Sequence, residues 1–296
     1  MIALPYPFEL MFMQRALIAG VAVGVFAPMI GTFLVQKRMS LIGDGIGHVA
    51  FAGVGAGLLA SVWPVWSALA FAVGGSLGVE WLRSRRRASG DLALALFFYS
   101  GIALGVVLVS VGGGSNASLL FRYLFGQPLI VNAHEVSVVV ALGVTIVLAM
   151  LGLRRVLFAV VTDEDWSRVS GLPAGLVNAV LAVVTAVAVV AAMEVVGVLL
   201  IAAMMVLPVA SAQSLARSFA GTMRWAVAVG VASVIAGLAV ARIWDLAPGG
   251  TIVLIAAGTF MIVSLVARGV GGRVPLPQPG SSDELSTSPR EGGHPT

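Results

Sequence analysis

The chain has 296 residues, of which 59% are hydrophobic and only 10% are charged, and its mean hydropathy is +1.05. Soluble globular domains carry roughly 25% charged residues, so this composition excludes a water-soluble enzyme and predicts an integral membrane protein with many spans. The net charge of +4 comes from short basic clusters between apolar runs, which indicate membrane orientation and not a nucleic-acid partner. Because the chain has no cysteine, any metal ligand must be His, carboxylate or backbone oxygen.

Apolar runs long enough to cross a bilayer predict an all-α, polytopic helical bundle with about nine spans, eight at the fewest. They lie at 16–36, 43–61, 65–82, 91–111, 135–153, 175–193, 197–216, 224–243 and 251–269. Residues 1–273 therefore form one transmembrane domain. Residues 274–296 are rich in Pro, Ser and Gly, and they predict a disordered tail in the cytoplasm.

The basic residues predict the orientation of these spans. Positive charges gather after spans one, three, five, seven and nine, while the opposite side receives only Arg15, Arg122 and Arg242. Under the positive-inside rule the crowded side is cytoplasmic, so we expect the N-terminus outside and the C-terminus inside. The crowded side holds Lys37/Arg38, Arg83/Arg85/Arg86/Arg87, Arg154/Arg155/Arg168, Arg217/Arg224 and Arg268/Arg273.

Several catalytic motifs are missing from the sequence. Lys37 is the only lysine and Arg38 follows it, so the chain contains no phosphate loop and is not its own P-loop ATPase. His134 is followed by Glu135, but Val138 occupies the position of the second histidine in a zinc-protease motif. A nucleophile elbow is absent as well. Transport is therefore the leading class of function.

Ionisable residues within spans are costly and often functional. Glu80 lies one turn from Arg83 near the inner membrane boundary, where a structural ion pair or snorkelling explains it. Glu194 falls at the hairpin between spans six and seven, where it is either a cation-entry residue or a plain loop carboxylate.

Asp44 and His48 are four residues apart at the start of the second span, so they share one face of a helix. A carboxylate and an imidazole placed in this way can ligate Zn²⁺, Mn²⁺ or Fe²⁺. Alternatively, Asp44 caps the helix and His48 is a buried imidazole bonded to it. Two ligands are also an incomplete site, which a two-fold dimer would double to four.

The run around this pair resembles the signature of the ABC-3 family, the zinc, manganese and iron permeases of ABC importers. The resemblance extends from residue 8 to 268 and includes RMSLIGDGIGHVAFAGVGAG (38–57), FMQRAL (12–17), YLFGQPL (123–129), VTDEDWSRVSGLPAGLVN (161–178), VGVLLIAAMMVLPVASA (196–212) and DLAPGGTIVL (245–254). Gly45, Gly47 and Ala52 stand where the family often has Ala, Ser and Pro.

The resemblance implies a type II importer-like permease that works as a homodimer in the cytoplasmic membrane of a prokaryote. Each copy would bind a separate cytoplasmic P-loop ATPase, and the pair would receive metal from an extracytoplasmic solute-binding protein. The divalent ion, with zinc favoured, would be the substrate, and no cofactor would be permanently bound. The family pattern assigns the metal to Asp44 and His48.

The resemblance also places a coupling helix for the ATPase at about 161–173. Its candidate residues are Asp163, Glu164, Asp165, Trp166, Val169 and Gly171. As an alternative, the three acidic residues cap an interfacial helix.

By analogy with related importers, Arg15 is the main candidate to dock a binding protein. Arg122, Arg242 and Asp245 are weaker ones.

Two alternative functions are also compatible with the sequence. A proton-coupled secondary transporter would use Asp44 and Glu194 as proton-relay carboxylates. An intramembrane enzyme would use Asp44 and His48 as acid and base, but the sequence offers no accompanying nucleophile.

Overall fold

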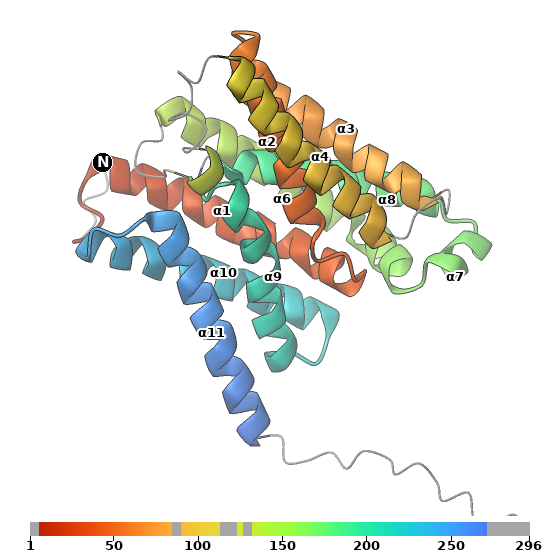
Figure 1. The fold of residues 1–296 in the computed structure, drawn as a ribbon. Coiled ribbons are helices and arrows are strands. Elements are labelled where there is room, and N and C mark those ends of the chain that lie inside the picture. The colour runs from red at the N-terminus through yellow and green to blue at the C-terminus, as the bar shows by residue number, and fades with distance from the viewer. Residues whose placement is uncertain (1–5, 85–89, 113–122, 127–131, 194, 271–296) are drawn as a thin grey trace, which may run out of the picture.

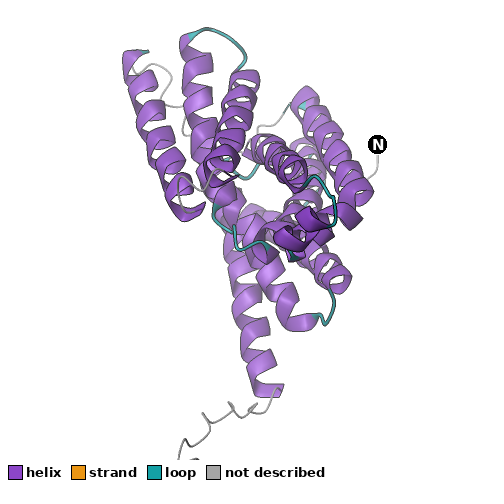
Figure 2. Ribbon diagram, turned by 90° about the vertical axis from the view of Figure 1, so that its right-hand side faces the viewer, coloured by secondary structure: helices purple, strands orange, loops and turns teal. Residues whose placement is uncertain are grey.

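The computed structural model describes residues 6–84, 90–112, 123–126, 132–193 and 195–270. These residues form helices and the turns between them, with no strand among them (Figure 2). They contain nine long helices and one short one: α1 (Met11–Gln36), α2 (Ile42–Leu59), α3 (Pro64–Ser84), α4 (Gly90–Val111), α6 (Ala133–Thr162), α7 (Glu164–Val169), α8 (Ala174–Met193), α9 (Val198–Leu215), α10 (Phe219–Ile243) and α11 (Pro248–Val270).

Each apolar run predicted from the sequence coincides with one long helix, so the predicted all-α bundle is confirmed. In the described part of the chain, eight helices are long and apolar enough to cross a membrane. The remaining long helix, α9, contributes a shorter apolar stretch, Leu200–Leu215. The predicted disordered tail, 274–296, lies outside the described residues.

Two helices extend well beyond the predicted spans. Helix α1 begins at Met11, so Arg15 lies within its first turns and not before the helix. Helix α6 continues from the predicted end at 153 to Thr162. Arg154 and Arg155 interrupt the apolar run, but arginine is a good helix former and the helix continues through both. Hydropathy alone therefore underestimates the length of α6.

The helices pack around a core formed mainly by α1, α2 and α8, which are the most buried of the spans. Helix α2 lies against α4 and α3, α1 lies against α10 and α6, and α9 contacts α10, α11 and α1. Figure 1 shows α11 leaving the bundle at its far end and α7 lying at the edge beyond α8. Helices α4 and α11 expose most of their apolar residues, as expected for surfaces that meet lipid or another chain.

A close helix crossing positions the second span. At Gly101 of α4, a Cβ atom would lie only 2.8 Å from the backbone carbon of His48 and the nitrogen of Val49. Only glycine allows α4 to approach the backbone of α2 so closely at His48.

Candidate metal centre

Asp44 and His48 lie side by side on α2, as their spacing predicts. Oδ1 of Asp44 is 3.6 Å from Nε2 of His48, and the Asp44 side chain is 30% exposed while that of His48 is 7% exposed. Two ligand atoms that each lie about 2.1 Å from a tetrahedral ion are roughly 3.3–3.6 Å apart. The observed separation therefore suits joint binding of one ion with little side-chain movement.

The structure contradicts the alternative in which Asp44 caps α2. The N-cap is Leu41, and no side chain makes a cap hydrogen bond there. The helix begins earlier than that alternative requires, because a tight turn in which Ile42 N–H donates to the Met39 carbonyl leads directly into it. The Asp44 carboxylate is thus placed in the first turn without a capping role, where the helix dipole favours a negative charge.

His48 is held from the side of α4. The ring of Phe98 meets the imidazole edge-on, with centroids 4.5 Å apart. The Nδ1 atom of His48 is buried and has no hydrogen-bond partner among the described residues. Packing therefore fixes the ring and leaves its Nε2 atom toward Asp44.

Asp44 opens onto a cavity between the start of α2 and α4. The cavity has a volume of about 240 Å³ and is lined by Leu41, Asp44, Leu94, Ala95, Phe98 and Tyr99. A larger cavity of about 470 Å³ shares Leu41 and Leu94 with it, and is also lined by Lys37, Arg38 and Arg83. The Asp44 carboxylate is therefore accessible from the smaller cavity, which adjoins the larger cavity lined by basic residues.

The short helix α7 lies in the segment that the resemblance assigns to coupling. Asp163 caps it, because its Oδ1 accepts a hydrogen bond of 2.8 Å from Trp166 N–H. Gly171, at φ 81°, ends it with a Schellman turn in which Leu172 N–H donates to the Ser167 carbonyl. Between these caps Asp165 is exposed, and the Trp166 and Val169 side chains are 62% and 89% exposed. Glu164 instead contacts basic residues of the bundle.

One family profile, described as the ABC 3 transport family, matches residues 9–267, nearly the whole described chain. The chain belongs to the ABC 3 transport family. Curated relatives include the manganese import system permease protein ScaB of Streptococcus parasanguinis, which is 31% identical over 86% of this chain and 91% of its own length. The high-affinity zinc uptake system membrane protein ZnuB of Haemophilus influenzae is 28% identical over 88% of this chain and 98% of its own.

A solved structure agrees with this ABC 3 assignment, and a second one shares the fold. PsaBC from Streptococcus pneumoniae, solved in complex with Fab, matches with a TM-score of 0.78 and 28% identity over 86% of this chain and 91% of that one. An inward-facing putative metal-chelate type ABC transporter shares the fold, with a TM-score of 0.67 at 16% identity. The protein is thus a membrane-embedded permease of the metal ABC transporter family, whose named members are transport subunits.

The structure describes three of the other candidate residues of this ABC 3 permease, Arg15, Arg242 and Asp245. Arg15 is partly buried in α1, and the carboxylate of Asp245 lies 3.9 Å from the Arg242 guanidinium at the end of α10. Arg122 and Glu194 lie outside the described residues. Helices α1 and α10 pack antiparallel, with Gly24 against Gly230 and Gly20 against Val234 and Leu238, so Arg15 and Arg242 lie toward the same end of this pair.

The partners of Glu164 outside α7, which are Lys37 and Arg83, were not evident from the sequence. Lys37, at the end of α1, and Asn178, in α8, lie 141 residues apart and form a hydrogen bond. The one available signal was that Lys37 is the only lysine of the chain. The expected ion pair of Glu80 with Arg83 is confirmed, with N–O distances of 2.8 and 2.9 Å.

Proposed function

We propose that this chain is the membrane subunit of an importer that carries a divalent transition-metal ion into the cytoplasm, with the ion bound in transit by Asp44 and His48. The observation that carries the proposal is the 3.6 Å separation of their ligand atoms beside an accessible cavity. Membership of the ABC 3 family and the names of its manganese and zinc relatives support it.

We further propose that two copies of the chain act together. The described residues contain no group of three or more His, Asp or Glu side chains that could hold a metal ion. Zn²⁺ usually takes four ligands, so a single copy offers half a site. A two-fold homodimer that brings two Asp44–His48 pairs together would complete it, since such an interface uses the same face of both copies.

Zinc is the ion we favour. Imidazole and carboxylate ligands bind Zn²⁺ more tightly than Mn²⁺ or Fe²⁺ in the usual order of affinities. A transported ion must also be released, which suits a site shared between two copies and holding few ligands from each. The names of the relatives include both manganese and zinc, so uptake of both ions is measured.

Energy for transport would come from a separate ATPase on the cytoplasmic side. The sequence has no phosphate loop of its own, and the exposed Trp166 and Val169 of α7 offer an apolar contact for a partner. With the N-terminus outside, as the basic residues predict, α7 faces the cytoplasm of a prokaryotic cell. Alternating access would then expose the metal pair first to a binding protein outside and later to the interior.

The test is metal uptake into lipid vesicles that contain the permease with its partner ATPase, with ATP inside the vesicles and the metal-loaded binding protein outside. We expect ATP to drive uptake of one ion, zinc or manganese, and expect an ATPase without its P-loop lysine to abolish it. Uptake driven by a proton gradient in the absence of ATP would overturn the proposal in favour of a secondary transporter. The amounts of zinc and manganese inside the vesicles are measured by elemental mass spectrometry.

Arg15 gives a further prediction about the outer surface. Arg15→Glu places a negative charge where we propose that an acidic part of the binding protein docks, so uptake should fall about tenfold through repulsion. Purified Arg15→Glu permease should still insert into membranes, because Arg15 lies in the first turns of α1. Titration of the binding protein against vesicles measures the affinity, and unchanged affinity would remove Arg15 from the docking surface.

A further inference from the structure

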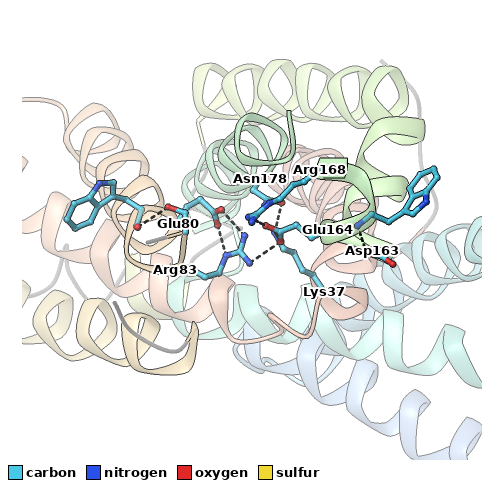
Figure 3. Close-up of polar contacts among 10 residues, drawn as sticks. Lys37, Glu80, Arg83, Asp163, Glu164, Arg168 and Asn178 are labelled. Carbon is cyan, nitrogen blue, oxygen red and sulfur yellow. Dashed lines mark hydrogen bonds and ion pairs between the residues drawn. The ribbon is translucent and has the colours of Figure 1, made fainter. Parts of the chain in front are cut away.

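Glu164 is the centre of a cluster of charges that joins α7 to the bundle (Figure 3). Its Oε2 atom lies 3.2 Å from a guanidinium nitrogen of Arg83 at the end of α3, and 3.9 Å from the ammonium of Lys37 at the end of α1. Its Oε1 atom accepts a hydrogen bond of 2.6 Å from Arg168 within α7 itself. One carboxylate thus contacts cations from three helices or helix ends.

Other contacts between α7 and the bundle are slight. Ser167 is its only buried residue in the described chain. Trp166 and Val169, the large apolar residues of α7, point into the surroundings and not into the core. Apart from its chain connections, α7 is therefore attached to the permease mainly through the charges on Glu164.

Lys37 continues this link toward the metal pair. Its ammonium also donates a hydrogen bond of 2.5 Å to Oδ1 of Asn178 in α8. A tight turn connects Lys37 to α2, because Met39 N–H donates to the Leu34 carbonyl and Gly45 N–H to the Leu41 carbonyl. Asp44 lies in the first turn of α2 immediately beyond it. A displacement of Lys37 would therefore move the start of α2.

We propose that Glu164 is a positioning residue that transmits movement of α7 through Lys37 to the start of α2, and so to the metal pair. The inference rests on the proposed function, in that a partner ATPase moves α7 and Asp44 binds the ion. In this proposal Glu164 transmits movement within the permease, and the exposed face of α7 binds the ATPase.

The cluster favours the charged form of Glu164 and disfavours the charged form of Lys37. Burial raises the pKa of Glu164, but the nearby Arg83, Lys37 and Arg168 charges outweigh it and hold this pKa below its usual value. The pKa of Lys37 is lowered to about 8, mainly by burial and then by repulsion from Arg83, with a smaller contribution from Arg168. Attraction to Glu80 and Glu164 raises this pKa but does not offset the lowering. As the pH rises through about 8, Lys37 loses its proton and its pairing with Glu164 is progressively lost.

The experiment compares Glu164→Gln, Lys37→Met and the double variant in vesicles with the partner ATPase. We expect each single variant to bind the ATPase normally and to raise the ATP hydrolysed per metal ion by about five- to tenfold. The double variant should be no worse than either single one, because both changes break the same link. An unchanged ratio in Glu164→Gln would overturn the proposal, and so would additive effects of the two changes.

Arg168→Gln is the matched control. It also removes a charge that contacts Glu164, but this pair joins α7 only to itself, so the ATP-to-metal ratio should stay near the wild-type value. Loss of ATPase binding in Glu164→Gln would show that Glu164 is a docking residue, and would contradict the inference. If the wild-type transporter moves no metal, the proposed function fails instead, and ATPase binding still tests where Glu164 acts.

A pH profile separates transmission from general stability. The wild-type ratio should rise between pH 7 and pH 9 as Lys37 loses its proton, whereas Lys37→Arg should keep a flat ratio because arginine stays charged. Lys37→Arg should also restore the coupling that Lys37→Met loses. A ratio in Lys37→Arg that rises with pH as in the wild type would contradict the role of this pair.

Discussion

Asp44→Asn should reduce metal accumulation to the background of cells without the permease, a loss of at least about 100-fold in the metal affinity of the site. The amide keeps the shape of the side chain but removes the anionic ligand that lies 3.6 Å from His48 Nε2. His48→Gln should have a similar effect through the other half of the pair. Zinc, manganese and iron are measured by elemental mass spectrometry in a metal-limited knockout strain complemented with each variant.

Asp44→Glu is the conservative comparison, because it keeps the carboxylate and moves it by one methylene group. We expect partial uptake from it and none from Asp44→Asn at equal expression. Normal accumulation with Asp44→Asn would leave Asp44 without a ligand role. In that case the secondary-transporter alternative would also lose its main proton-relay carboxylate, since Asn cannot carry the proton.

Gly31→Ala should give the largest loss of stability, about 2–4 kcal/mol in the free energy of unfolding. A Cβ atom at Gly31 of α1 would lie 1.9 Å from the Met205 carbonyl oxygen and 2.8 Å from its carbonyl carbon. These are backbone atoms of α9, so no side chain can rotate away and the two helices must separate. Unfolding of the purified permease in detergent measures the change.

Gly152→Ala in α6 is the matched control, because nothing lies within 4 Å of a Cβ atom at that position. Both changes add one methyl group to a glycine inside a long helix. Alanine has a higher helix propensity, so Gly152→Ala should leave stability unchanged or raise it by up to about 1 kcal/mol. Equal destabilisation by both variants would show that the crossing of α1 with α9 tolerates separation.

The spans of this protein could be predicted because apolar runs of about 20 residues dominate the sequence. Their ends could not be predicted as well. Helix α6 continues through Arg154 and Arg155 to Thr162, since hydropathy records the change in polarity and not the backbone hydrogen bonds. The early start of α1 at Met11 has the same origin.

The candidate site was predictable where it is local. Asp44 and His48 share a helix face because of their spacing, and the structure keeps them together. The surroundings of Glu164 depend on residues far away in the sequence, 81 positions from Arg83 and 127 from Lys37, and no short-range pattern joins them. Tertiary packing decides whether Glu164 faces the basic residues of the bundle or the solvent. A single sequence does not show this packing.

The position of Lys37 also makes its side-chain amine a natural site for chemical labelling that depends on conformation. It is the only lysine of the chain, its side chain is only 9% exposed, and its pKa of about 8 leaves a large share of it as a neutral, nucleophilic amine near that pH. Acylating reagents that attack amines therefore find one side-chain target in the molecule. Because the Lys37 side chain is nearly buried at the junction of α1, α3 and α7, we expect its labelling to become faster whenever this junction opens, which would report on the transport cycle without an introduced probe.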